Sequence, residues 1–248
     1  MPHKVLILAG SAEARELAAV LAEQPDWHTV SLFAGRPTSP NLPAGEVRTG
    51  GFGGAAPLAR LLQEEQFLAI VDATHPFATG ISRNALAAAE TARLPLLRLN
   101  RPPWVQQAGD QWHEVDDWPE AIPLLAGQSA RAFLAIGHQE LRAFSGLGDS
   151  FFLVRTIDPP DAPLPLERYE VITGKGPFSL QDETTLLQQY EISHLVCKNS
   201  GGISAYSKLE AARALGLPVI IKRRPPALRS PLVSNVGEAV AWLSAVCG

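Results

Sequence analysis

The stretch DATHPFA, residues 72–78, carries the side chains best suited to proton chemistry. Asp72 closes an apolar run, Thr74 and His75 follow it, and Pro76 prevents a regular strand from continuing. A histidine in such a turn can donate a hydrogen bond or a proton near neutral pH. His75 is therefore a candidate catalytic residue, and the alternative is a turn histidine that bonds only to backbone.

Two other stretches, TGKGPFS and KNSGG, place a lysine beside glycine after an apolar run. Lys175 in the first and Lys198 in the second can hold carboxylates or phosphates as point charges. A solvated lysine is the alternative at each position, but two lysines in equivalent places favour an anion-binding role. We expect no metal site, because the six histidines form no HxxxH or HxH pair and the two cysteines are isolated.

The N-terminal stretch LILAGSAEARELA is typical of the strand, turn and helix that open a dinucleotide-binding fold. Of the three glycines in the usual fingerprint it keeps only Gly10. That glycine can still form the turn, and Ser11, Ala12 and Glu13 can still present N–H groups to a phosphate at the start of the helix. A plain strand-to-helix turn is the alternative.

Gly35 and Arg36 follow the second predicted strand, where folds that select NAD usually carry an acidic residue. An arginine there accommodates the 2′-phosphate of NADP, and its guanidinium can bind a phosphate through two parallel hydrogen bonds. The sequence thus favours NADP over NAD, although a lone loop arginine can equally be solvated. The stretch GGFGG at 50–54 either lets backbone approach a ligand closely or forms a flexible loop.

The elements that must position these residues alternate between short apolar strands and amphipathic helices. This alternation predicts parallel sheets with helices on both faces, and ligands at the carboxyl ends of the strands. In the first hundred residues we predict strands at 5–8, 29–33, 67–71 and 94–97, and helices at 13–23, 56–65 and 81–92. Later in the chain we predict strands at 131–136, 151–155, 169–172, 194–197 and 218–221, and helices at 180–190, 208–215 and 236–246.

The segment RPPWVQQAGDQWHEVDDWP, residues 101–119, interrupts the alternation with prolines and tryptophans. We therefore predict two α/β domains, 1–102 and 103–248, rather than one continuous sheet. HEVDDWPEAIPLL and SNVGEAVAWL share a valine, a turn, an acidic residue and an amphipathic helix. Their similarity is either an echo of one half in the other or convergent helix patterning.

Composition and charge limit the classes of partner. The chain has 248 residues, of which 46% are hydrophobic and 19% charged, as in globular proteins. A net charge of -4 and the lack of a Lys/Arg-rich run argue against nucleic acid as a partner. No apolar run approaches the roughly 20 residues that cross a bilayer, and the opening MPHKVLILAG lacks the features of a secretory signal. We expect a cytoplasmic protein without membrane contact, and the oligomeric state is open, with a monomer as one option.

In order along the chain, the stretches GxxEAR, AGR, GGFGG, DATHPFA with SRNA, KGPF, KNSGG and KLEAARALGLPVI resemble the precorrin-6A reductase family of cobalamin (vitamin B12) biosynthesis. The similarity runs from about residue 5 to residue 240. DATHPFA and KNSGG are its specific part, whereas the GxxEAR turn is not specific.

The resemblance implies an NADPH-dependent oxidoreductase that reduces one macrocycle double bond of precorrin-6A, or of cobalt-precorrin-6A, to give precorrin-6B. It also implies two Rossmann-like parallel-sheet domains with the active-site cleft between them. The first domain would bind NADP(H), and the second would complete the substrate cleft. By position, the cofactor side comprises Gly10, Ser11, Ala12, Glu13, Gly35, Arg36, Asp72, Ala73 and Thr74, and the facing wall comprises Lys175, Lys198, Asn199, Ser200 and Gly201.

The reaction needs a proton and the substrate needs cations. His75, Lys198 and Ser200 are the candidate catalytic residues, with His75 favoured as proton donor. The available cations for the substrate carboxylates are His138, Arg83, Arg98, Arg101, Arg142, Arg155 and the KRR run at 222–224. Two rival functions stay open: an NADP-dependent reductase of another acidic metabolite, and a non-catalytic tetrapyrrole or nucleotide carrier.

Overall fold

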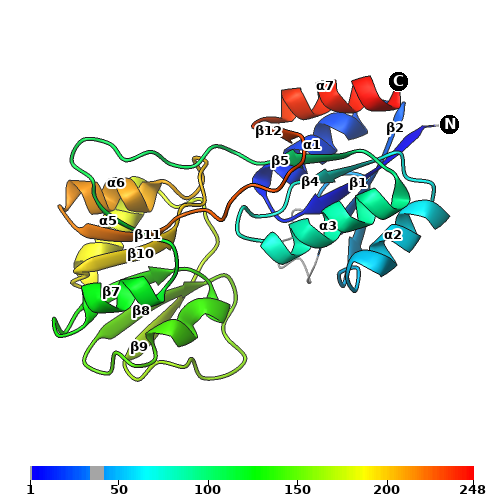
Figure 1. The fold of residues 1–248 in the computed structure, drawn as a ribbon. Helices are drawn as coiled ribbons and strands as arrows, with labels where there is room; N and C mark the ends of the chain where they lie inside the picture. The colour runs from blue at the N-terminus through cyan, green and yellow to red at the C-terminus, as the bar shows by residue number, and fades with distance from the viewer. Residues whose placement is uncertain (1, 34–41) are drawn as a thin grey trace. The chain divides into compact units, whose positions relative to one another are not determined.

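The chain divides into two compact α/β units in a computed structural model that describes residues 2–33 and 42–248 (Figure 1). Unit 1 comprises Met1–Pro102 together with Pro225–Gly248, and unit 2 comprises Pro103–Arg224. The predicted second domain, 103–248, is therefore wrong at its C-terminal end, because residues 225–248 belong to unit 1.

Unit 1 contains a six-stranded, fully parallel sheet in the order β12-β5-β4-β1-β2-β3. Its strands are β1 (His3–Ala9), β2 (Trp27–Phe33), β3 (Glu46–Thr49), β4 (Ala69–Asp72), β5 (Leu96–Leu99) and β12 (Leu232–Val233). Counted within the unit, this is the 3-2-1-4-5-6 order of dinucleotide-binding folds, in which the strand order reverses between β1 and β4.

Helices cover both faces of this sheet, as the continuous apolar run of β1 requires. Val5, Ile7 and Ala9 pack on the side of α1 (Ala12–Ala22) and α7 (Val236–Cys247). Leu6 and Leu8 pack on the opposite side, with α2 (Ala55–Glu64) and α3 (Thr79–Ala92). Strand β1 is thus buried on both faces, which fixes the position of the turn after it.

The C-terminal segment joins unit 1 through both a strand and a helix. Leu232 and Val233 of β12 pair with Arg98 and Leu99 of β5. The apolar face of α7 packs against α1 and is buried there (Figure 1). The helix itself was predicted correctly at 236–246, but its apolar pattern does not specify which of two sheets will cover it.

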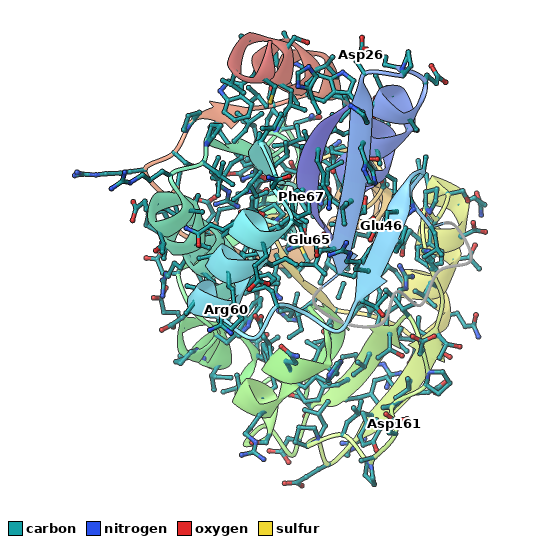
Figure 2. All side chains as sticks on the ribbon, turned by 90° about the vertical axis from the view of Figure 1, so that its right-hand side faces the viewer. Asp26, Glu46, Arg60, Glu65, Phe67 and Asp161 are labelled. Atoms are coloured by element: carbon teal, nitrogen blue, oxygen red, sulfur yellow. The ribbon has the colours of Figure 1, made fainter. Side chains whose placement is uncertain are left out.

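A network of charged side chains connects β3, the edge strand of the unit 1 sheet, to Glu65 at the end of α2. Arg48 of β3 donates to both carboxylate oxygens of Glu65 at 2.6 and 2.8 Å, and to Glu46 at 2.6 Å. Lys4 also donates to Glu65, at 2.7 Å. Figure 2 looks onto this edge, with Glu46 on β3 and Glu65 at the end of α2 labelled.

Unit 2 contains a second six-stranded, fully parallel sheet in the order β6-β11-β10-β7-β8-β9. Its strands are β6 (Gln111–Val115), β7 (Arg131–Ala135), β8 (Phe151–Thr156), β9 (Tyr169–Thr173), β10 (His194–Lys198) and β11 (Pro218–Lys222). In chain order, β7 to β11 are arranged in this sheet as β1 to β5 are in unit 1. Strand β6 occupies the edge position that β12 holds in unit 1.

The two faces of the second sheet are covered differently. On one face lie α5 (Leu180–Gln189) and α6 (Ser207–Ala214). The other face packs against short elements: η1 (Pro119–Ala121), α4 (Ile122–Leu125) and the 3₁₀ helix η2 (His138–Phe144). The two similar stretches noted in the sequence thus occupy equivalent places. HEVDDWPEAIPLL runs from β6 into η1 and α4. SNVGEAVAWL follows β12 directly and runs into α7.

The predicted fold class is confirmed: the protein has two parallel-sheet α/β units, each in the strand order of a Rossmann-like fold. Three edge strands, β3, β6 and β12, were not predicted, nor were the short helices of unit 2. Among the residues that the structure describes, no helix is long and apolar enough to span a bilayer. The cleft between the domains and the cytoplasmic location stay predictions.

Candidate functional site

The point of reversed strand order in unit 1 brings two predicted cofactor turns together. Gly10 follows β1, and a Cβ placed on it would lie 3.7 Å from Thr74 Cα and from His75 N. The Ser11 hydroxyl donates to the carbonyl oxygen of Ala73 at 2.8 Å, which ties the two turns to each other. Ligands of open α/β sheets bind at such points, so this edge of unit 1 is a candidate nucleotide site.

The start of α1 is capped by its own side chains. Ser11 is the N-cap residue and accepts a hydrogen bond from Ala14 N–H at 3.2 Å. Glu13 in the first turn forms an ion pair with Arg101 at 2.7 Å. Burial alone would raise the pKa of Glu13, but its own backbone N–H and the Arg101 guanidinium outweigh that effect and hold the pKa below its ordinary value. Arg101 therefore compensates a negative charge at the place where a phosphate would bind.

Asp72 at the end of β4 shapes the turn that carries His75. Its Oδ1 accepts from the backbone N–H and the hydroxyl of Thr74, at 3.1 and 2.6 Å. Its Oδ2 lies 3.3 Å from Arg98 Nε, and neither atom has a partner with hydrogen-bond geometry. Because Asp72 is only 1% exposed, its carboxylate orders the turn from within the protein.

His75 is half-buried just beyond this turn, and its Nδ1 accepts a hydrogen bond from Phe77 N–H at 3.3 Å. A neutral imidazole that accepts at Nδ1 carries its proton on Nε2, so this contact selects the tautomer with an Nε2–H donor. Gly35 and Arg36, the other predicted cofactor residues, lie outside the described residues.

The equivalent point in unit 2 lies between β7 and β10 and holds a lysine. Lys198 ends β10, and its Nζ lies 3.0 Å from Glu140 Oε1. The other carboxylate oxygen of Glu140 accepts a hydrogen bond from Trp118 Nε1. Glu140 was not predicted, although it lies in GHQEL directly after a predicted strand, where a carboxylate could have been sought for Lys198.

The KNSGG loop, residues 198–202, turns back on itself after β10. Ser200 N–H donates to the Lys198 carbonyl at 2.7 Å, and the Ser200 hydroxyl donates to the same oxygen at 3.4 Å. Gly201 has a φ of +67° and is buried, which a side chain at this position would not allow without strain. The Asn199 side chain is buried and bonds to the backbone of Trp104.

The remaining predicted substrate residues are not gathered at one point. His138 is exposed at the start of η2. Lys175 is exposed after β9, the edge strand of the sheet, two strand positions from β7 and about 10 Å away at the usual strand spacing. The structure thus brings Lys198 beside Glu140 and leaves Lys175 in a separate loop.

Most of the cations proposed for the substrate carboxylates have partners within their own unit. Arg155 binds both oxygens of Glu183 at 2.7 and 2.8 Å. Arg98 faces Asp72, Arg101 faces Glu13, Arg223 faces Asp116 and Arg224 donates to backbone carbonyls. Arg83 and Arg142 are exposed. The sequence therefore did not show that most of these arginines already have partners within the protein.

Burial makes the thiol of Cys197 a weak acid. Cys197 lies in the middle of the core, and burial raises its pKa to about 11, so its thiol stays protonated near neutral pH. Within 2–33 and 42–248, no group of three or more His, Cys, Asp or Glu side chains is arranged to hold a metal ion.

Comparison with known proteins identifies the family. The family described as "Precorrin-6x reductase CbiJ/CobK" matches residues 4–244. The chain belongs to this family. It is therefore an oxidoreductase of cobalamin biosynthesis, as the sequence motifs predicted.

Individual relatives agree over almost the whole chain. The precorrin-6A reductase of Rhodococcus erythropolis is 47% identical over 97% of both chains. That of Rhodobacter capsulatus is 42% identical over 97% of this chain and 96% of its own. A solved structure titled "CobK precorrin-6A reductase" is 42% identical, covers 99% of this chain and 97% of its own, and superposes with a TM-score of 0.93.

Proposed function

We propose that this protein reduces one macrocycle double bond of precorrin-6A to give precorrin-6B, with NADPH bound at unit 1. The element after the central strand supports this assignment of the nucleotide. In unit 1, Gly10 leads into an α-helix of 11 residues, whose N-terminus favours a phosphate. In unit 2 the same place holds the seven-residue 3₁₀ helix η2, which offers fewer aligned backbone dipoles.

The residues around Gly10 fit a dinucleotide phosphate. Gly10 is exposed, and an added Cβ would meet only ordinary van der Waals contacts, so a ligand can approach the backbone here. The Ser11 bond to Ala73 holds the turn in place before any ligand binds. Arg101 offsets the charge of Glu13, which would otherwise repel a phosphate. Gly10 to Ala12 would hold the phosphates, and Arg36 would bind the 2′-phosphate.

NADPH, when bound, supplies the hydride for the reduction. The protein has to align the substrate, exclude water and deliver a proton to the macrocycle. We assign the proton delivery to Nε2 of His75 in its imidazolium form, in which Nδ1 is also protonated and gives up the contact with Phe77 N–H. The Asp72 and Thr74 hydrogen bonds keep the turn before His75 in one conformation.

Lys198 is assigned to the negative charge of the substrate. Its ammonium is held by Glu140, whose second oxygen is held by Trp118, so the cation has a fixed position before substrate binds. A fixed cation near the macrocycle stabilises charge that develops on the conjugated system as the hydride arrives. Ser200 and His138 are further donors in the same unit, and the tetrapyrrole carboxylates are their proposed partners.

The decisive experiment is the reaction itself. The purified protein is mixed with NADPH and precorrin-6A, and the loss of dihydronicotinamide absorbance and the mass of the product are followed. We expect oxidation of NADPH and a product two mass units heavier. Binding without oxidation would indicate a carrier, and no response to the macrocycle would indicate a reductase of another metabolite.

Cobalt-precorrin-6A is tested in parallel. We expect the metal-free substrate to react faster, since the relatives with 47% and 42% identity are named for precorrin-6A.

The cofactor assignment is tested at Arg36. Arg36→Ala should weaken NADPH binding about tenfold or more, because a charge-assisted contact to the 2′-phosphate is lost. NADH binding should not change, because NADH lacks that phosphate. Dissociation constants from nucleotide fluorescence give both values, and an equal loss for NADPH and NADH would remove Arg36 from the site.

A further inference from the structure

Both chain crossings between the units are fastened to the KNSGG loop on the unit 2 side. Where the chain enters unit 2, Trp104 N–H donates to Asn199 Oδ1 at 2.8 Å, and Asn199 Nδ2 donates to the Trp104 carbonyl at 3.0 Å. Where the chain leaves, Arg224 Nε donates to the Asn199 carbonyl at 2.9 Å. A second Arg224 nitrogen donates to the Ser200 carbonyl at 2.8 Å. One loop therefore holds the two ends of unit 2.

All the hydrogen-bonding atoms of Asn199 have partners inside unit 2. Each of its four polar atoms has a partner within unit 2, since its backbone N–H donates to the Lys222 carbonyl at 3.0 Å. The residue is 6% exposed. This differs from the expectation that Asn199 binds substrate, because a direct contact of its side-chain oxygen would compete with the bond from Trp104.

Trp104 makes the entry point rigid. Its indole Nε1 donates to the Gly202 carbonyl at 2.7 Å, and the residue is 8% exposed. Its ring centroid lies 6.0 Å from that of Tyr206, and Lys208 Nζ lies 4.9 Å from the ring centroid. The backbone and the side chain of Trp104 thus both hold the KNSGG loop.

The crossings themselves are stiff. Each contains the sequence Arg-Pro-Pro, at 101–103 and at 224–226. Proline fixes its own φ and restricts the preceding residue to extended conformations, so such a segment transmits a displacement with little bending. The first crossing is also held on the unit 1 side, where Arg101 pairs with Glu13 at the start of α1.

We propose that the Asn199 side chain is a positioning group that fixes the entering crossing, through Trp104, to the KNSGG loop and thereby keeps Lys198 and Ser200 in place for the reaction. The inference rests on the proposed function, because it assigns the benefit to the turnover of precorrin-6A. Loss of the anchor frees the loop and lowers turnover, because small displacements of catalytic groups reduce rates strongly. It leaves nucleotide binding intact, since Asn199 lies outside unit 1.

The test compares the full-length protein with Asn199→Ala in two measurements. Hydrogen exchange at the Trp104 amide reports the anchor directly, and kcat and KM for precorrin-6A and the Kd for NADPH report its consequence. We expect exchange at residue 104 to become about tenfold faster, which corresponds to the loss of one buried hydrogen bond. We expect kcat to fall by about the same factor, with the Kd for NADPH unchanged.

Asn235→Ala is the matched control, because Asn235 also accepts a hydrogen bond from backbone, from Glu238 N–H at 2.9 Å, but at the start of α7 in unit 1. It should lower stability without changing kcat or the exchange of Trp104. Asn199→Asp is the second variant and serves if Asn199→Ala does not fold. The aspartate keeps the bond from Trp104 N–H but presents no donor to the Trp104 carbonyl, so kcat relative to wild type should recover as the pH falls and the carboxyl gains a proton.

Unchanged exchange at Trp104 in a folded variant would overturn the proposal. A raised KM for precorrin-6A with unchanged kcat and unchanged exchange would also overturn it, and would make Asn199 a direct substrate contact. The exchange measurement needs no substrate. If the wild-type protein does not oxidise NADPH with precorrin-6A, the proposed function fails, while the contact between Asn199 and Trp104 is still decided by exchange.

Discussion

The two units share one strand order but differ in the element that comes after the central strand. In unit 1, β1 leads through Gly10 into the 11-residue helix α1. In unit 2, β7 leads through Gly137 into the 3₁₀ helix η2. A glycine and a strand end are present in both, but only the first forms the N-terminus of an α-helix at that point. The topology thus offers two equivalent edges, and the local element decides which edge suits a phosphate.

The turns after the corresponding strands β4 of unit 1 and β10 of unit 2 also differ. In unit 1, Asp72 bonds to Thr74 two residues later, so the turn is ordered locally. In unit 2, Asn199 bonds to Trp104, which is 95 residues away in the sequence. The first turn thus combines this local bond with the Ser11 bond to Ala73, whereas the second depends on the segment that enters the unit.

The largest expected effect tests the chemical roles of the two turns. His75→Ala should lower kcat about 100-fold, as expected for loss of a general acid, and leave the Kd for NADPH unchanged. The measurement is steady-state turnover of precorrin-6A with a separate nucleotide titration. His28→Ala is the control. His28 lies at the N-terminal end of β2, away from the carboxyl ends of the strands where the candidate site lies, and its side chain is 46% exposed. Unchanged turnover in His75→Ala would show that His75 is only a structural residue. The proton donor would then have to be sought in unit 2.

Lys198→Ala examines the corresponding position of unit 2. Removal of the ammonium should raise KM for precorrin-6A about tenfold and lower kcat, because charge stabilisation is lost and Glu140 is left without its cationic partner. Lys198→Arg should restore part of the affinity, since the positive charge is kept. A loss confined to NADPH affinity would contradict the assignment of Lys198 to the substrate.

A pair of glycine substitutions sharpens the difference between the first turns. Gly10→Ala should fold normally, because the nearest atoms to the new Cβ lie at 3.7 Å, yet raise the Kd for NADPH about tenfold by occupying the phosphate approach. Gly137→Ala should lower the free energy of unfolding by about 1–3 kcal/mol, because Gly137 has a φ of +83°, without affecting the Kd. Nucleotide titration and urea unfolding give the two quantities. The opposite pattern would assign the nucleotide to unit 2.

The smallest effect concerns the acid stability of unit 1. Hydrogen bonds from Arg48 and then Lys4 lower the pKa of Glu65 to about 2. Since this folded-state pKa lies below the ordinary value, the ionised carboxylate stabilises the fold above about pH 4.5, and that contribution is lost as the pH falls towards 2. Glu65→Gln should cost about 1 kcal/mol at pH 7 and less at pH 3, measured by urea unfolding.

Glu64→Gln is the control for this measurement, because Glu64 is the exposed neighbour of Glu65 on the same helix end. Equal losses in the two variants, or a loss for Glu65→Gln that does not shrink in acid, would show that the network with Arg48 contributes nothing specific to unit 1.

The accuracy of the sequence-based predictions varied with burial. Central strands such as β1 and β10 are apolar runs buried on both faces, and the sequence located them to within two residues. The edge strand β6, with the sequence QWHEV, is largely exposed and has no apolar run to mark it. β12 has only two residues. Edge strands bury one side at most, so their sequences lack the signal that central strands carry.

The structure has the predicted residues at strand ends, while their roles in binding and catalysis stay predictions. Reading the residues after each strand predicted Gly10, His75 and Lys198 as neighbours of the sheet edges, and the structure has them there. The same reading could not show that Asn199 bonds to Trp104, nor that most of the arginines are already paired. Those contacts join residues that lie far apart in the chain.

By itself the sequence determined the class of fold, the family and the turns at which chemistry can occur, because apolar periodicity and glycine positions act over a few residues. Tertiary structure alone decided that residues 225–248 return to unit 1, that Arg98 and Arg101 face carboxylates, and that the KNSGG loop holds both crossings. The physical reason is that a helix face, a guanidinium or a buried amide specifies the kind of partner it requires. Which partner it finds depends on how the whole chain packs.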